Sequence, residues 1–254
     1  MIRILLISIL WIVTIIASII WSYENPEKIE KFKSYFEKSI EPEITNEKQT
    51  FKIAANSFSL NVEKILSVNQ KTAFLAHPLK EKFNLNKLTI FTQNGFKIIN
   101  SNVEKLNLPK EFTLQRNGGI KTIINFNNKD LAFFSSNKSD CYYSSLIDLT
   151  NQNTIFKTKC LPEEAKNNDF NGLGSSNIHT QDAILLTIGT PEKHSSKNSI
   201  LAQKDDFAYG KVLQFKKIEL EKKLKDNNFD LSYEIYSKGH RVPQGITILN
   251  NKIY

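Results

Sequence analysis

Arginine is scarce in this sequence. It occurs only at Arg3, Arg116 and Arg241, so nearly all of the formal net charge of +8 comes from lysine. Guanidinium groups are the preferred partners of phosphate, and here the lysines are scattered among acidic residues rather than clustered. Such a pattern is typical of a solvated surface. The composition therefore argues against a nucleic-acid partner, which would need a concentrated basic surface.

Metal-binding patterns are missing as well. The chain has four histidines, and no two of them have the i, i+4 spacing of a helical zinc site. The only two cysteines, Cys141 and Cys160, offer no metal-binding motif. With 40% hydrophobic and 24% charged residues, the bulk of the chain is predicted to be globular rather than disordered.

The two cysteines flank a predicted β-hairpin. Residues 142–149 and 154–159 are β-type runs, and a turn centred on residues 150–151 would place Cys141 directly opposite Cys160. Opposite Cβ atoms on paired strands lie about 4.5–5.5 Å apart, within reach of disulfide geometry after a small adjustment. We therefore predict a Cys141–Cys160 disulfide. The alternative is a pair of buried free thiols.

There is one long apolar run, at residues 4–21. A hydrocarbon core needs about 20 such residues in a helix, and Trp21 and Tyr23 stand where aromatic rings prefer the lipid–water interface. Arg3 precedes the run and acidic residues follow it, which predicts a cytoplasmic N-terminus and an exported main domain, periplasmic or extracellular. A lipid bilayer is thus the first predicted partner. A cleaved signal peptide is the alternative.

The chain divides into three predicted parts: a transmembrane anchor at residues 1–23, a helix and linker at 24–50, and a β domain at 51–254. In the second part Ile29, Phe32 and Phe36 have helical spacing. The third part consists of short β-type runs separated by Asn, Gly, Lys and Asp, without periodic helices between them. This pattern predicts a mostly β fold, either a sandwich, a barrel or a propeller.

A weak internal repeat favours the propeller. A glycine-marked turn precedes a predicted hairpin at residues 118–119, 172–174 and 244–245, and propeller blades recur at about 40–50 residues. Chance in an Asn-rich chain is the alternative. The last hairpin stops mid-strand at Tyr254, and the length after the anchor allows at most about four or five blades. The prediction is a partial or shortened β-propeller, incomplete at its C-terminus and preceded by a single N-terminal transmembrane helix.

The C-terminal third resembles a known family. Residues 234–245 read Glu-Ile-Tyr-Ser-Lys-Gly-His-Arg-Val-Pro-Gln-Gly, which resembles the Glu-Ile-Tyr-x-x-Gly-His-Arg-Asn-Pro-Gln-Gly signature of the glucose/sorbosone dehydrogenases. Residues 186–189 and 202–213 are similar to further segments of that family, in the same order. These enzymes are soluble, PQQ-dependent aldose dehydrogenases built as six-bladed propellers, and the resemblance covers roughly residues 171–254.

The resemblance implies oxidation of a sugar C1 hydroxyl, with hydride transfer to PQQ and calcium polarising the quinone. Arg241 would contact the cofactor or the transferring charge, and Gln244 would bind cofactor or sugar. Val242 replaces the family's Asn, Thr190 replaces an Asp, and Asn171 stands nearest the position of the catalytic His. Two functions therefore remain open: a membrane-anchored PQQ-dependent sugar dehydrogenase, and a non-catalytic propeller that binds a glycan or protein at the outer face of the membrane.

Overall fold

The computed structural model describes most of the chain outside the first 20 residues: residues 21–38, 40–45, 49–54, 59–64, 67–76, 87–100, 102–139, 141–161, 168–191, 197–250 and 252–254. Within these residues no helix is both long enough and apolar enough to span a membrane. Residues 1–20 of the predicted transmembrane anchor lie outside the described residues.

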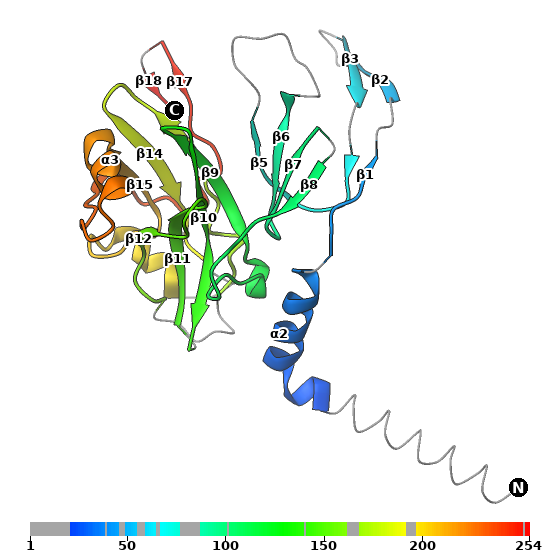
Figure 1. Ribbon diagram of the computed structural model, residues 1–254, viewed down its shortest axis with the longest axis horizontal. Helices are drawn as coiled ribbons and strands as arrows, with labels where there is room; N and C mark the ends of the chain where they lie inside the picture. The colour runs from blue at the N-terminus through cyan, green and yellow to red at the C-terminus, as the bar shows by residue number, and fades with distance from the viewer. Residues whose placement is uncertain are drawn as a thin grey trace, which may run out of the picture.

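The predicted mostly β fold is confirmed (Figure 1). The described residues form three four-stranded antiparallel sheets, and each sheet is built from four strands that follow one another along the chain. The first contains β5 (Thr72–Ala76), β6 (Thr89–Thr92), β7 (Phe96–Ile99) and β8 (Asn102–Lys105). The second contains β9 (Ile120–Phe126), β10 (Lys129–Lys138), β11 (Cys141–Asp148) and β12 (Thr154–Lys157). The third contains β13 (Asn177–His179), β14 (Ala183–Ile188), β15 (Lys211–Lys216) and β16 (Glu234–Lys238).

Three two-stranded pairs complete the described β structure. β1 (Ile44–Thr45) pairs with β4 (Ser67–Val68), and β2 (Gln49–Ala54) pairs with β3 (Ser59–Lys64). At the C-terminal end, β17 (Ile248–Leu249) pairs with β18 (Lys252–Ile253). The glycine turns of the predicted repeat precede β9, β13 and β17, so each of them leads into the first strand of a sheet or hairpin.

The second sheet is buried on both faces because its strands carry apolar side chains at successive positions. Side chains alternate between the two faces of a strand. Leu131 and Phe133 of β10 enter a core shared with the third sheet, whereas Ala132 and Phe134 enter a core shared with the first sheet. Each of the four is 0% exposed. The near-continuous apolar run of β10 is therefore the sequence signature of a sheet packed between two others.

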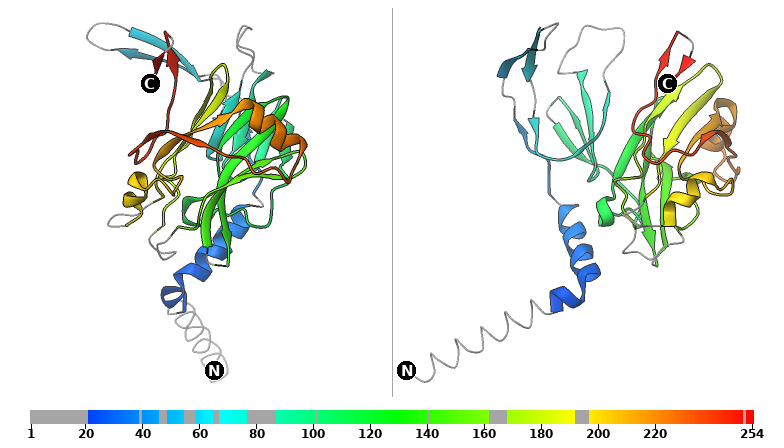
Figure 2. Two further views of the ribbon diagram at one scale, coloured as in Figure 1. Left: turned by 90° about the vertical axis from the view of Figure 1, so that its left-hand side faces the viewer. Right: turned by 180° about the vertical axis from the view of Figure 1, so that it is seen from behind.

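The first strands of the three sheets adjoin in chain order, β5 with β9 and β9 with β13. Asn177 of β13 donates from Nδ2 to Thr122 Oγ1 and Ile123 O of β9, at 3.0 and 2.9 Å. Ile120 N of β9 donates to Gln93 O, in the turn that follows β6, at 2.9 Å. The loops leading into β5, β9 and β13 lie at the end of the sheets where the first described helix lies (Figure 2). We call this end the proximal face and define it by residues 69–71, 115–119 and 168–174.

That helix is α2 (Pro26–Glu37), whose Pro26 stands at the first helical position, where a missing N–H costs nothing. A second helix, α3 (Lys217–Lys225), lies between β15 and β16. The apolar residues of α3 are few, so the sequence shows little helical periodicity there; Leu220 is buried whereas Ile218 is 77% exposed. Two short 3₁₀ helices, η2 (Gln115–Asn117) and η4 (Lys197–Gln203), precede β9 and β15.

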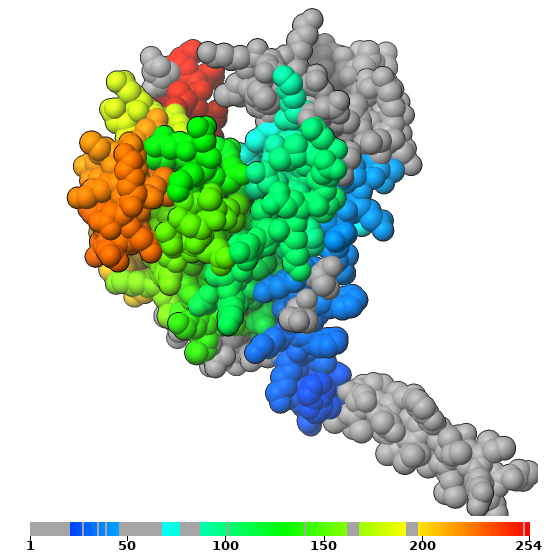
Figure 3. Space-filling model, viewed as in Figure 1, coloured from blue at the N-terminus to red at the C-terminus, as the bar shows by residue number. Residues whose placement is uncertain are grey.

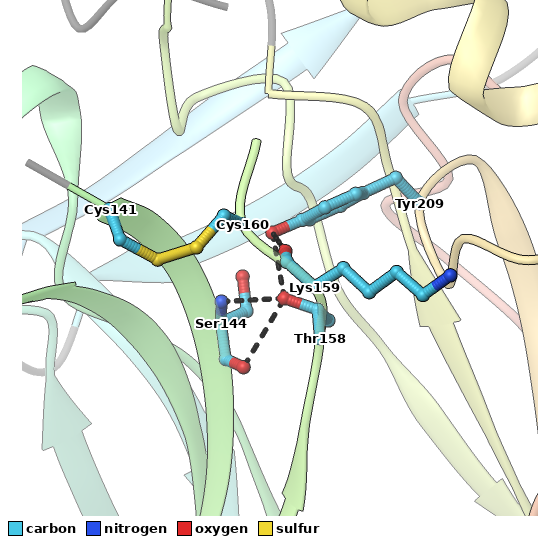
Figure 4. The surroundings of a disulfide bond; sticks show 6 residues. All are labelled: Cys141, Ser144, Thr158, Lys159, Cys160 and Tyr209. Carbon is cyan, nitrogen blue, oxygen red and sulfur yellow. Dashed lines mark hydrogen bonds between the residues drawn. A yellow bond between two sulfur atoms is a disulfide. The ribbon is translucent and has the colours of Figure 1, made fainter. Parts of the chain in front are cut away.

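The predicted Cys141–Cys160 disulfide is present, with a Cα–Cα distance of 5.4 Å (Figure 4). The cysteines are not directly opposite, because the β11–β12 register shifts between Leu146 and Ile147. Beside the bridge, Tyr209 OH lies 2.7 Å from Thr158 Oγ1. Tyr209 belongs to the loop before β15, so this contact joins the third sheet to the end of the second. Burial raises the pKa of the Tyr209 phenol, which stays neutral.

Candidate ligand-binding site

The structure places Arg241 and Gln244 in a turn that docks on the end of β14. Thr190 N donates to Arg241 O at 2.8 Å, and Thr187 Oγ1 donates to Pro243 O at 2.8 Å. The Arg241 and Gln244 side chains are exposed. A Cβ on Gly174 would lie 3.0 Å from Gln244 Cγ, so the turn is seated against residues 168–174 of the proximal face. Its backbone fixes its position and leaves the two side chains at the surface.

The segments that resemble the dehydrogenase family come together at this end of the third sheet. A Cβ on Gly189 would lie 2.1 Å from Gly172 O and 2.9 Å from Arg241 O. A Cβ on Gly210 would lie 2.3 Å from the Ala202 Cβ. These glycines are needed because backbone segments approach too closely for any side chain. Gly189 and Gly210 of these segments therefore have a structural role here.

Lys211 belongs to the same segments and is fully buried at 0% exposure. Its Nζ donates to Leu201 O at 2.8 Å, to Tyr209 O at 3.0 Å and to Ala202 O at 3.4 Å. Burial lowers the pKa of this lysine. An ammonium group has three donors, and all three are used by carbonyls at the end of η4 and beyond it. Lys211 therefore fixes the β14–β15 connection, and its amine is inaccessible to a ligand.

Lys121, which the sequence did not single out, lies nearer the centre of the proximal face. Phe134 pairs with Ile120 and Phe133 with Thr122, so Lys121 is the extra residue of a β-bulge at the start of β9. Bulges commonly redirect a side chain. Lys121 Nζ donates to Asn117 O at 2.8 Å. Burial, together with the positive charge of Lys71, lowers the Lys121 pKa to about 8.

A polar network joins the loops that lead into β9 and β13. Asn117 Nδ2 donates to Asp169 Oδ1 at 3.1 Å, and Asn171 N donates to the same oxygen at 2.9 Å. Arg116 and Asn117 both have left-handed backbone conformations, at φ 54° and 57°, which cost roughly 1–3 kcal/mol each for residues with a side chain. Glu30 of α2 holds the first of them through an ion pair of 2.9 Å with the Arg116 guanidinium. Strain of this kind is typical of binding sites.

A cleft of about 470 Å³ opens between α2 and the proximal face. This volume falls within the roughly 300–1,000 Å³ of small-molecule sites. Carboxamides, lysines and carboxylates dominate its lining, with few apolar residues: Glu30, Lys33, Ser34, Glu37, Ile40, Asn69, Gln70, Lys71, Gln93, Asn94, Leu114, Asn117 and Gly118. Figure 3 shows α2 against the body of the molecule, and its residues Glu30, Lys33, Ser34 and Glu37 form one wall of the cleft.

The described residues do not fit the calcium and quinone chemistry that the resemblance implies. No three His, Cys, Asp or Glu side chains among them are grouped so as to hold a metal ion. Asn171 stands nearest the position that the resemblance implies for the catalytic histidine, and an amide cannot accept a proton at working pH. His179 lies at the other end of β13, opposite Ile184, where burial and Lys217 lower its pKa. We therefore derive no reaction step through PQQ or calcium.

Comparison with known proteins adds no relative: no protein family, curated protein or solved structure shows significant similarity to this chain. The resemblance to glucose/sorbosone dehydrogenases thus depends on the motif residues between 171 and 254 alone. What the chain binds has to be argued from the proximal face and its cleft.

Proposed function

We propose that this chain is a membrane-tethered, exported domain of the propeller type that binds a glycan at its proximal face without catalysing a reaction on it. Three points support the propeller. Each four-stranded sheet is formed by consecutive strands, the sheets follow one another in chain order, and their first strands adjoin. Propeller blades have this arrangement. The apolar run at residues 4–21 supports the tether.

The observation that carries the glycan proposal is the lining of the cleft beside α2. Asn69, Gln70, Gln93, Asn94 and Asn117 all line it, although the amide donors of Gln93, Asn94 and Asn117 are already bound to other groups of the chain. A carboxamide presents both a donor and an acceptor, and so does a sugar hydroxyl. Lys33 and Lys71 add donors for hydroxyl or carboxylate oxygens. The cleft therefore offers hydrogen-bonding groups to a polar carbohydrate, and it exposes apolar surface to a similar extent, against which the C–H face of a sugar ring can pack.

The test is to apply the purified full chain in detergent to an array of neutral and acidic oligosaccharides and to measure the best ligand by calorimetry. Replacing Gln70 and Lys71 by Ala should weaken binding about tenfold or more, since each lost hydrogen bond costs about 1 kcal/mol or more. Lys157→Ala, an exposed lysine on β12, is the matched control and should leave the affinity unchanged. Undiminished binding by the double variant would place the ligand elsewhere.

A PQQ-dependent sugar dehydrogenase is the second candidate function. It is favoured by the finding that the segments resembling that family lie together at one end of the third sheet. Its test uses the same preparation with PQQ, calcium and a panel of aldoses, followed by dye reduction and cofactor absorbance. Turnover would contradict the non-catalytic proposal. An array without glycan ligands, combined with capture of a defined exported protein, would instead favour a protein partner.

A further inference from the structure

The helix α2 is oriented with its polar side toward the rest of the domain. Ser34 is only 7% exposed, and Glu30 forms the ion pair with Arg116. Asn94 Nδ2 donates to Glu37 O at 3.3 Å. Helices on the surface of a globular domain ordinarily bury an apolar stripe and expose a polar one. In α2 the two sides are exchanged.

The apolar stripe of α2 faces away from the domain. Ile29, Phe32 and Phe36 are spaced three and four residues apart, which places them on one side of a helix. They are 39%, 72% and 61% exposed. Two phenylalanines and an isoleucine side by side in water are unfavourable, because burying each would contribute roughly 1.5–3 kcal/mol. Contiguous exposed apolar surface of this kind marks contact with another protein or with a membrane.

The residues around the stripe point to a membrane. Trp21 and Tyr23, only a few residues before α2, are 47% and 89% exposed, and such rings favour the lipid–water interface. Lys28 flanks the stripe with its amine 5.7 Å from the centroid of the Trp21 ring, and a lysine in this position extends its amine toward the headgroups. The apolar run at residues 4–21 ends at the same point of the chain.

We infer that α2 lies in the interface of the bilayer, with Ile29, Phe32 and Phe36 inserted among the lipid chains and headgroups. The polar side of α2 then contacts the proximal face. The inference rests on the membrane tether of the proposed function. It adds an orientation to that tether: the cleft between α2 and the proximal face opens next to the membrane surface. The glycan class selected by this geometry is one displayed close to the bilayer.

The experiment uses the full chain reconstituted in phosphatidylcholine–phosphatidylglycerol vesicles. Both native cysteines are in the disulfide, so Phe32→Cys introduces a single free thiol that can carry an environment-sensitive fluorophore. We expect a blue-shifted emission that nitroxide-labelled lipids quench severalfold more than a water-soluble quencher does. Lys31→Cys is the matched control on the same helix. Its exposed position lies off the stripe, so its fluorophore should report water.

Three outcomes separate the possibilities. Emission from position 32 that matches position 31 overturns the inference while leaving the tether intact, provided that the protein still floats with the vesicles. Failure to float with vesicles contradicts the tether itself. Protection of position 32 that appears only at high protein density, with disulfide crosslinks between the introduced thiols of two copies, identifies a second copy rather than lipid as the occupant and also overturns the inference.

Discussion

Single residues at the proximal face carry its chemistry. A bulge in β9 redirects Lys121, whose amine lies against Asn117 O. In the sequence Lys121 is one lysine among many, with nothing to distinguish it from the solvated ones. Its lowered pKa comes from burial between the loops of neighbouring sheets, and this burial is a property of the tertiary structure. For Arg241 the order is opposite, because the sequence motif singled it out as a cofactor contact. In the structure its backbone carbonyl accepts a hydrogen bond from Thr190 N, and its side chain is exposed.

Lys121 should make stability depend on pH in the alkaline range. Its pKa is lowered from 10.5 to about 8 in the folded chain, so between these values the unfolded chain binds a proton that the folded chain does not. The free energy of unfolding should therefore rise as pH increases from about 8 to about 10.5. Lys121→Met should lose this rise. Urea unfolding of both proteins at closely spaced pH values measures the difference, and parallel curves would contradict it.

At the scale of elements, periodicity predicted most of what formed. The predicted β-type runs at residues 142–149 and 154–159 correspond to β11 and β12, and the helical spacing of Ile29, Phe32 and Phe36 lies within α2. Other elements have short or mixed apolar patterns, among them β8, β13 and α3. Their strands form because a neighbouring strand supplies hydrogen-bond partners, which no local pattern records.

The close backbone approach at the end of β14 should make Gly189 intolerant of any side chain. Gly189→Ala would put a Cβ within 2.1 Å of Gly172 O and 2.9 Å of Arg241 O. We expect a loss of at least about 2 kcal/mol in the free energy of unfolding, the usual scale of overpacking. Gly245→Ala is the matched control, because nothing lies within 4 Å of its Cβ. Equal denaturation midpoints for the two variants would contradict the structure.

At the scale of the whole molecule, the second sheet joins the other two. Its β10 contributes Phe133 to the core with the third sheet and Phe134 to the core with the first. The Phe134 ring lies 5.5 Å from that of Phe112, edge to face. Two cores that share one sheet should not lose their structure independently, because loss of either face exposes the backbone and side chains of the same strands.

This coupling predicts that Phe134→Ala destabilises both cores. Removing the buried ring should cost about 3–5 kcal/mol, and amide hydrogen exchange should accelerate in β14 and β15 as well as in β6 and β7. Tyr236→Ala, at a side chain that is 50% exposed, is the control and should leave exchange nearly unchanged. Acceleration confined to residues 72–105 would show that the first sheet unfolds as a separate unit.

The sequence by itself determined the local features: the mostly β fold, the amphipathic α2, and the disulfide, because alternation, helical spacing and hairpin symmetry are written in neighbouring residues. The tertiary structure decided the rest. It placed Lys121 at the proximal face, turned the apolar stripe of α2 outward and made Gly189 a contact between three backbone segments. These outcomes depend on which surfaces meet across long stretches of chain. That choice is settled by the total burial and hydrogen bonding of the folded molecule, so no local pattern contains it.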